Sequence, residues 1–452
     1  MTGFTWQSEN EVTRGTKAAV ILPDIVRTAR DTERSVRDTA AQLEEAKGLA
    51  LAIGVDIVIA QILRVRTVKP ATLFGAGQIE DLAAQIEAQG VELVIIDASL
   101  SPVQQQNLEK GLKAKVIDRT GLILEIFGER AATAEGRLQV ELAHLDYQQG
   151  RLVRSWTHLE RQRGGFGFLG GPGETQIESD RRMIRDRMAK LRRELDQVKR
   201  TRSLHRGRRQ RAPWPIVALV GYTNAGKSTL FNRMTGADVM AEDLLFATLD
   251  PTMRQVGLPG IDKVILSDTV GFVSNLPTQL IAAFRATLEE VLAADLIVHV
   301  RDISHPDTQA QKQDVERVLR ELGVGPGGEG EDGDPDALSI PVVEIWNKID
   351  AVNADTAVLL REDAARRDDV AIVSALTGEG GDAAKQWLAD KLTSGNAVRH
   401  LALPQSAGEA LAWLHEHGQV LKQEADDGEI AVDVLISDKD YARFLNRWMP
   451  VA

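Results

Sequence analysis

The sequence predicts an α/β protein made of four parts, and three observations support this class. Short apolar strands alternate with helical segments early in the chain, as in a largely parallel sheet covered by helices. A central region carries apolar residues at heptad spacing, and a later apolar strand runs into a glycine-rich turn and a helix. We expect an N-terminal parallel-sheet α/β domain, an antiparallel helical hairpin, a second α/β domain and a small C-terminal α/β appendage. Their predicted bounds are 1–134, 135–211, 212–394 and 395–452.

The composition is typical of a globular protein in water. The chain has 452 residues, of which 43% are hydrophobic and 27% charged. Apolar runs are much shorter than the roughly 20 residues that span a bilayer, and the first residues do not form an apolar secretory signal. The absence of cysteine excludes disulfides, thiolate catalysis and Cys-type zinc sites. We therefore expect a cytoplasmic protein. We also expect it to be a monomer.

The net charge of -12 hides a basic segment. Residues 181–211 contain 14 Lys and Arg against 3 Asp and Glu. A basic segment on an acidic chain indicates one element that faces an anion such as RNA. The alternative is an arginine-rich helix face in contact with water only.

The first domain is predicted from its alternating pattern. The expected strands are 17–22, 55–65, 91–97 and 113–117, and the expected helices are 31–51, 77–88 and 102–112. Strands joined by helices favour a parallel sheet.

Two heptad seams predict the hairpin that follows. The first seam consists of Leu138, Leu142, Leu145, Gln149, Leu152, Trp156 and Leu159, and the second of Ile184, Met188, Leu191, Leu195 and Val198. Adjacent seams joined by a loop are most simply an antiparallel pair of helices. Gln149 is a polar break in the first seam.

The connecting loop, GGFGFLGGPGE at 164–174, contains a formal G-x-G-x-x-G. A dinucleotide site requires an apolar strand before these glycines, whereas here the charged stretch LERQR precedes them, so we reject that interpretation. Phe166 and Phe168 either fold back onto the helices or stack on nucleic-acid bases.

Three further segments complete the prediction. Residues 206–211 are expected to form a linker before a domain that starts at Ile216, and 323–337 to form a disordered acidic insertion. The appendage is predicted as helix 408–417, strand 429–436 and helix 439–448.

The segment GYTNAGKS has the G-x-x-x-x-G-K-S pattern between an apolar strand and a helix. Its residues are Gly221, Tyr222, Thr223, Asn224, Ala225, Gly226, Lys227 and Ser228. Such a loop wraps a phosphate with backbone N–H groups at a helix N-terminus. Lys227 is expected to reach the β- and γ-phosphates, and the Ser228 hydroxyl to ligate Mg²⁺.

A second strand delivers Asp268, Thr269, Val270 and Gly271. We expect Asp268 to hold the Mg²⁺ shell and the Gly271 amide to sense the γ-phosphate.

The residues that follow a third strand are expected to determine which base is bound. This strand delivers Asn347, Lys348, Ile349 and Asp350, and a later strand delivers Ser374, Ala375 and Leu376. The Asp350 carboxylate can accept two hydrogen bonds from guanine, a pair of donors that adenine does not offer on that edge. The Lys348 stem can lie along the base, and a backbone amide of 374–376 can donate to guanine O6. The four elements in this order predict a P-loop GTPase domain that binds GTP and GDP.

The segment between the first two motifs is the expected mobile switch. It comprises Phe246, Ala247, Thr248, Leu249 and Asp250. Thr248 and Thr252 are both candidates to complete the Mg²⁺ shell; we favour Thr248, whose context ATLDP resembles the switch threonine of related GTPases. Either threonine can instead stabilise a turn before Pro251.

The expected catalytic groups are Lys227, Thr248 and Gly271. Phe272 stands where Ras-like GTPases carry a water-orienting glutamine, so intrinsic hydrolysis is expected to be slow and to need outside help. Asn224 can coordinate K⁺ beside the β- and γ-phosphates, or simply stabilise the loop.

Taken together, these residues resemble the HflX-type translational GTPases of the Obg–HflX group. The resemblance rests on GPGETQIESDRR at 171–182, GYTNAGKS, FATLDPT, DTVGF and NKID, and it covers nearly the whole chain. The family's glycine loop usually reads GGxGxxGPGE with a basic residue; here it is one residue longer and lacks that charge.

The resemblance implies a cytoplasmic, stress-related GTPase that binds the large (50S) ribosomal subunit and its rRNA and splits or rescues stalled ribosomes. The hairpin at 135–211 is the expected rRNA contact. Two alternatives stay open: a GTP-sensing regulatory module with incidental hydrolysis, and an RNA-remodelling enzyme whose N-terminal domain uses ATP.

Overall fold

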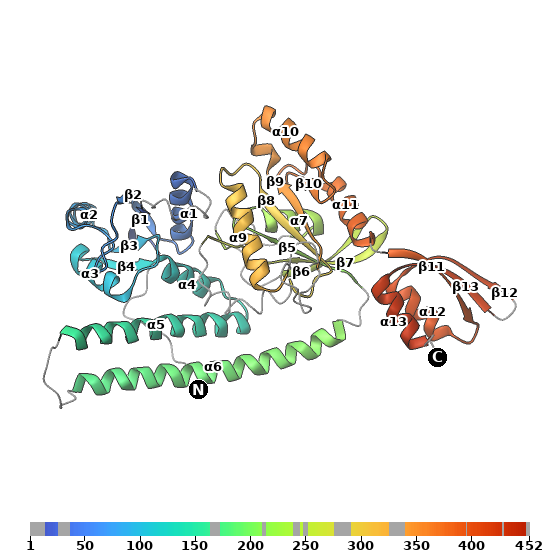
Figure 1. Ribbon diagram of the computed structural model, residues 1–452, viewed down its shortest axis with the longest axis horizontal. Helices are drawn as coiled ribbons and strands as arrows, with labels where there is room; N and C mark the ends of the chain where they lie inside the picture. The colour runs from blue at the N-terminus through green and yellow to red at the C-terminus, as the bar shows by residue number, and fades with distance from the viewer. Residues whose placement is uncertain are drawn as a thin grey trace.

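The α/β architecture expected from the sequence is confirmed by a computed structural model of the chain. The structure describes residues 14–25, 37–162, 172–209, 214–237, 245–246, 252–274, 291–324, 340–394, 396–426 and 429–448. Figure 1 shows two sheet domains side by side, a long pair of helices along one side of both, and a small C-terminal sheet. The bounds of the four predicted parts remain a prediction.

The N-terminal domain holds a four-stranded parallel sheet in the order β2-β1-β3-β4. The strands are β1 (Lys17–Ile25), β2 (Asp56–Val65), β3 (Leu93–Ile96) and β4 (Lys115–Asp118). The helices are α1 (Thr39–Leu51), α2 (Ala76–Gln89), α3 (Pro102–Leu112) and α4 (Arg119–Arg130). Side chains alternate across a strand, so Ala19 and Ile21 pack with α2 and α3, whereas Ala18 and Val20 pack with α1 and α4.

Two details of this domain differ from the prediction. The first helix begins at Thr39 and not at 31, because the Asp38 side chain accepts a hydrogen bond from the Ala40 amide and caps the helix there. Residues 31–36 lie outside the described residues. Helix α4 was not predicted, although the apolar run GLILEIF is buried within it.

The predicted hairpin is confirmed where its side chains are described. Helices α5 (Ala134–Gln162) and α6 (Pro172–Arg209) lie side by side in Figure 1. Leu145, Met188 and Leu191 form its buried core, and Arg187 pairs with Glu141 at 2.7 Å. Phe166, Phe168 and the side chains of Leu152, Trp156 and Leu159 lie outside the described residues.

Both ends of α6 correct the prediction. The helix starts at Pro172, inside the segment expected to be a loop, because proline fits the first turn of a helix. It continues to Arg209, so 206–209 are helical and not a linker. The arginines favour helix, and the next breaker is Pro213.

The second α/β domain holds a six-stranded sheet in the order β10-β9-β8-β5-β7-β6, with only β6 antiparallel. The strands are β5 (Ile216–Gly221), β6 (Thr252–Leu258), β7 (Ile261–Asp268), β8 (Leu296–Asp302), β9 (Val342–Asn347) and β10 (Val370–Ile372). The helices are α7 (Lys227–Thr235), α9 (Thr308–Glu321), η2 (Ile349–Ala351), α10 (Ala354–Ala365) and α11 (Gly381–Thr393). Most of the predicted acidic insertion, 325–337, lies outside the described residues.

The appendage is a three-stranded antiparallel sheet in the order β11-β13-β12 with two helices. Its elements are β11 (Asn396–Pro404), α12 (Gly408–His417), β12 (Gln419–Asp426), β13 (Glu429–Ser437) and α13 (Asp438–Trp448). Strands β11 and β12 were not predicted. Their sequences mix polar and apolar residues, and they become strands by pairing with β13.

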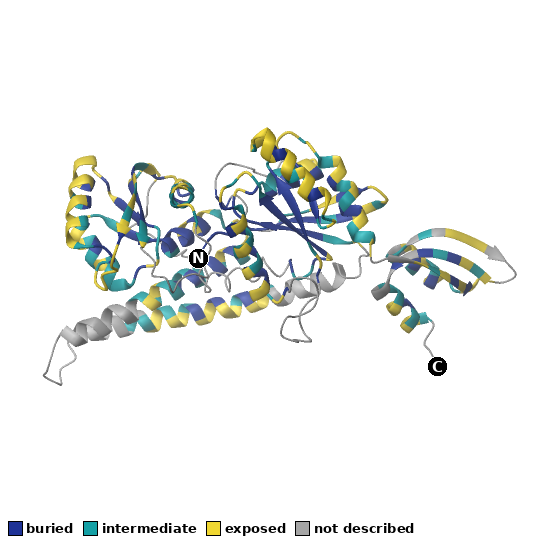
Figure 2. Ribbon diagram, turned by 45° about the horizontal axis from the view of Figure 1, so that its top comes forward, coloured by how far each residue is buried: buried dark blue, intermediate teal, exposed yellow. Residues whose placement is uncertain are grey.

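Burial is concentrated on the sheets, as Figure 2 shows. One apolar cluster includes residues of both the N-terminal and the second α/β domain. Within it the ring of Phe127 meets that of Phe246 edge-on, with 4.7 Å between centroids. Within the described ranges, we find no helix with the length and apolar content needed to cross a membrane.

Candidate guanine-nucleotide site

The phosphate loop lies between β5 and α7, as predicted. Gly226 caps α7 with a φ of 89°, a value that glycine adopts readily. A Cβ on Gly226 would lie 2.2 Å from the Asn347 amide nitrogen, so no larger residue fits there. Asn224 is exposed and has a φ of 58°, which asparagine tolerates better than most residues.

Lys227 is buried beneath the loop. Its Nζ donates to the carbonyl oxygens of Tyr222 (2.8 Å) and Gly221 (3.1 Å). Burial lowers the pKa of the Lys227 ammonium to about 8, and the nearby Asp268 carboxylate opposes that shift. A buried cation inside a glycine loop is the arrangement that a phosphate group stabilises.

The expected metal ligands lie together. The Ser228 hydroxyl donates to an Asp268 carboxylate oxygen at 2.7 Å, at the end of β7. A hydroxyl and a carboxylate are hard oxygen ligands of the kind that Mg²⁺ prefers, so this donor set fits the metal that a P-loop GTPase fold carries with its nucleotide. Thr252, the alternative switch threonine, is the register partner of Asp268 on β6.

Gly271 lies directly over the loop. A Cβ there would be 2.7 Å from Thr223 Cγ2 and 3.1 Å from Lys227 Nζ. The position therefore requires glycine, and its backbone lies next to the cation expected to bind the γ-phosphate. Thr269 and Val270 are buried; the Thr269 hydroxyl donates to the Leu219 carbonyl at 2.7 Å.

Asn347 connects the phosphate loop to the loop at 374–376 that is expected to bind the base. Its side-chain amide donates to the Ala225 carbonyl (2.8 Å) and accepts from the Ala375 amide (2.9 Å). Only 1% of Asn347 is exposed. Both bonds are buried, so the spacing between the phosphate loop and the 374–376 loop is fixed within the domain.

The remaining residues that are predicted to bind the base follow β9 and β10. Asp350 is exposed in η2, whereas Ile349 beside it is buried. Lys348 has a φ of 65°, and its ammonium pairs with Asp302 at 2.8 Å. Ser374 is buried, and Leu376 is 72% exposed at the surface of the loop. The Ala375 amide is bonded to Asn347, which leaves the Leu376 amide as the next donor along this loop.

Arg233, which was not predicted as a site residue, holds the loop at 374–376. From the last turn of α7, its guanidinium donates to the carbonyls of Ala375 (2.7 Å) and Leu376 (2.6 Å). No local pattern marks this arginine, because its partners are more than 140 residues away in the chain.

The switch segment is only partly described. Phe246 is buried with its ring on Phe127, and Tyr222 directs its hydroxyl to Glu45 of the N-terminal domain. Ala247, Thr248, Leu249 and Asp250 lie outside the described residues. Thr248 therefore stays a prediction.

Comparisons with known proteins identify the family to which the chain belongs. Four family models match: a GTP-binding GTPase N-terminal region over 40–128, a GTP-binding GTPase middle region over 130–209, a 50S ribosome-binding GTPase over 216–326 and an HflX C-terminal domain over 359–451. A GTPase HflX from Magnetococcus marinus is 49% identical over 387 residues, or 86% of this chain and 85% of that protein. The chain belongs to the HflX family of GTPases.

A second relative supports the same assignment. The GTPase HflX of Escherichia coli K12 is 40% identical over 402 residues, covering 89% of this chain and 91% of its own. A GTP-binding protein from Sulfolobus solfataricus, solved with GDP, aligns with 84% of this chain and 99% of its own at 23% identity, with a TM-score of 0.44. As an HflX-family GTPase, this chain binds guanine nucleotides and hydrolyses GTP.

Proposed function

We propose that this GTPase acts on the large ribosomal subunit and couples its nucleotide cycle to the splitting or rescue of stalled ribosomes. The observation that carries the proposal is a complete guanine-nucleotide motif set on the same chain as a long basic hairpin. A region of that chain matches a family described as 50S ribosome-binding GTPases.

The hairpin supplies the RNA-facing surface in this proposal. Helix α6 has exposed basic side chains at Arg182, Arg185, Lys190, Arg192 and Arg193. Cations along one helix attract the phosphate backbone of rRNA. In Figure 1 the joined ends of α5 and α6 extend past the N-terminal sheet, a geometry suited to reaching into a large partner.

In the same proposal one end of the site binds the triphosphate and Mg²⁺, and the other end binds guanine. Lys227, Ser228, Thr248 and Asp268 hold the triphosphate and Mg²⁺, which would neutralise charge on the phosphates. Asn347, Lys348 and Asp350 select guanine. The Gly271 amide binds the γ-phosphate in this proposal. When hydrolysis removes that phosphate, the bond is lost and the segment after Gly271 can move.

Slow intrinsic turnover follows from Phe272. Its ring is 1% exposed and has no group that hydrogen-bonds water. The chain therefore depends on groups supplied from outside. One is K⁺ held by Asn224, whose exposed side chain belongs to the phosphate loop. Equal GTP turnover in potassium and sodium buffers would remove this part of the proposal.

Ribosome splitting can be tested by light scattering. Whole ribosomes mixed with the protein and a non-hydrolysable GTP analogue should lose scattering as subunits separate, whereas GDP should give no change. The control is a variant with Arg182, Arg185, Arg192 and Arg193 changed to Gln, which keeps helix propensity but lowers the charge. Unchanged scattering with the GTP analogue would contradict the splitting function.

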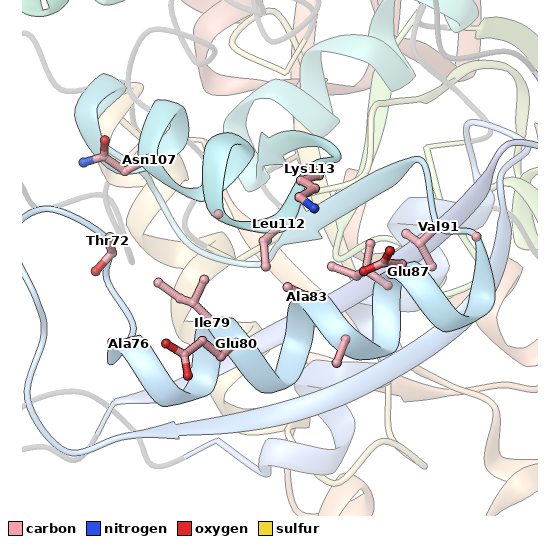
Figure 3. Close-up of a pocket in the computed structure, with 14 residues that line it drawn as sticks. Thr72, Ala76, Ile79, Glu80, Ala83, Glu87, Val91, Asn107, Leu112 and Lys113 are labelled. Carbon is pink, nitrogen blue, oxygen red and sulfur yellow. The ribbon is translucent and has the colours of Figure 1, made fainter.

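The alternative of an ATP-using N-terminal domain gains no support from the groove in that domain. This groove lies between α2 and α3 and has a volume of about 700 Å³. Figure 3 shows that Ile79, Ala83 and Leu112 line it together with the carboxylates of Glu80 and Glu87. Lys113 also lines the groove, but the two carboxylates outnumber this single cation and leave the lining negative, which disfavours a triphosphate. Its two glycines, Gly90 and Gly111, are isolated and form no glycine-rich phosphate loop. ATP turnover by a fragment ending near residue 211 would revive this alternative.

A further inference from the structure

The end of β8 lies beside the turn that is expected to bind the base. In the parallel pair of β8 and β9, Asp302 is the register partner of Asn347. The Ile303 amide continues this pairing and donates to the Asn347 carbonyl at 3.1 Å. Ligands of parallel α/β sheets bind at the carboxyl ends of the strands, where these two residues lie. Residues 302–304 therefore border the predicted guanine site.

The two carboxylate oxygens of Asp302 have different partners. Oδ2 pairs with the Lys348 ammonium, with 2.8 Å between the oxygen and Nζ. Oδ1 accepts hydrogen bonds from the Ser304 amide (3.0 Å) and the Ser304 hydroxyl (2.6 Å). The Asp302 side chain is only 12% exposed, so water screens these bonds weakly. The bonds from Ser304 orient the carboxylate, and the oriented carboxylate holds the lysine.

The strand that carries Asp302 is anchored on its opposite face. Side chains alternate along a strand, so Arg301 lies on the other side of the sheet from Asp302. Its guanidinium donates to Glu344 at 2.6 Å, and the Trp346 indole donates to the same carboxylate at 2.8 Å. The Arg301 and Glu344 side chains are both buried. These bonds join β8 to β9 and fix where Asp302 lies relative to the Lys348 backbone.

Lys348 benefits from a fixed partner because its side chain is long and flexible. The stem has four carbons, and its side chain is 29% exposed. Affinity is lost when such a side chain has to be ordered as the ligand binds, and it is regained when the side chain is ordered beforehand. The backbone holds one end of the Lys348 stem and Asp302 holds the other, so the stem is ordered in advance.

We propose that Asp302 is a positioning residue for guanine binding: it holds the Lys348 ammonium at the end of β8, so that the Lys348 stem is ready to lie along the base. The proposal rests on the proposed role of Lys348 at the base. Asp302 acts through Lys348 and does not itself touch the nucleotide. GTP and GDP carry the same base, so Asp302 contributes equally to the binding of both.

The test measures the affinities of the full chain for GDP and for a non-hydrolysable GTP analogue by calorimetry. Asp302→Asn keeps an acceptor for Ser304 but loses the charge that holds Lys348. Both affinities should fall together by about 3- to 10-fold, the cost of ordering one long side chain on binding. The matched control is Asp368→Asn, which makes the same change in a Lys–Asp pair, with Lys391 on α11. Its affinities should stay within about twofold of the parent protein.

A double mutant separates positioning from a purely structural role. Lys348→Ala removes the group that Asp302 is proposed to hold. Adding Asp302→Asn to Lys348→Ala should therefore weaken neither nucleotide by more than about a further twofold. Unchanged affinities in Asp302→Asn alone would overturn the proposal. An equally large loss with and without Lys348 would also overturn it, because Asp302 would then act on the fold of the turn.

Ser304→Ala provides the test if Asp302→Asn does not fold. It removes the hydroxyl that orients the carboxylate, so both affinities should fall by about threefold, and this loss should vanish when Lys348 is also replaced. No loss in Ser304→Ala would then count against Asp302. The role of Lys348 is judged separately: unchanged affinities in Lys348→Ala alone would contradict its proposed place along the base.

Discussion

The two ends of the proposed nucleotide site, the base end and the phosphate end, are held in place differently. The base end is held within one domain, because Asn347 and Arg233 bond the loops around it directly. The phosphate end is held in part by the N-terminal domain, because Glu45 accepts a hydrogen bond from Tyr222 and Arg119 donates one to Ser274. Guanine selection is therefore expected to be independent of the rest of the molecule, whereas the response to the γ-phosphate is open to control from outside.

The largest expected effect is at the base end. Asp350→Asn exchanges the carboxylate for a group that cannot accept both guanine donors, so GTP affinity should fall on the order of 100-fold. Xanthosine triphosphate should gain affinity, because its additional oxygen suits an amide donor. Binding of both nucleotides can be measured by competition.

Asp355→Asn is the control for this substitution. It makes the same chemical change at an exposed position in the first turn of α10. Its GTP affinity should be unchanged. Unaltered GTP preference in Asp350→Asn would mean that the base does not lie at Asp350.

A smaller effect on nucleotide affinity is expected when the loop at 374–376 loses the hydrogen bonds that hold it. Arg233→Met removes two hydrogen bonds to the 375–376 carbonyls but keeps much of the apolar stem. GTP and GDP affinities should fall together by roughly tenfold, the equivalent of about one charge-assisted hydrogen bond.

Arg361→Gln tests whether any arginine near this loop has the same effect. Arg361 pairs with Glu379 at 2.6 Å, and both side chains are about half exposed. Exposed ion pairs contribute little, so the affinities should change by less than about twofold. If Arg233→Met lowered GTP affinity but not GDP affinity, the base end and the phosphate end would not be independent, and this outcome would contradict the account.

The smallest predicted effect is a pH dependence at the phosphate end. Because the pKa of Lys227 is lowered to about 8, the nucleotide-free protein loses this positive charge above that pH. Phosphate binding must then take up a proton, so GTP affinity should fall about threefold between about pH 7.5 and pH 8.5. Calorimetry in buffers of different ionisation enthalpy would detect the proton taken up when GTP binds. If no proton is taken up at the higher pH, the pKa of Lys227 is not lowered.

The sequence predicted local chemistry better than long-range contacts. The phosphate loop, the Asp268 strand and the NKID turn were found because each motif follows an apolar strand whose end it occupies. Strands β11 and β12 were missed because their pairing partner creates them. Arg233, Glu45 and Arg119 were missed for a related reason: each acts on residues distant in the chain, and nothing in the neighbouring sequence marks them.

The most direct test of the account is GTP turnover with and without large ribosomal subunits, measured together with GDP affinity. We expect the subunits to raise GTP turnover by at least about tenfold, because they supply the water-orienting group that the Phe272 ring lacks. GDP affinity should stay within about twofold, because the base end is fixed inside its own domain. Turnover that is equal in both conditions would contradict the central claim that this GTPase is triggered from outside at its phosphate end.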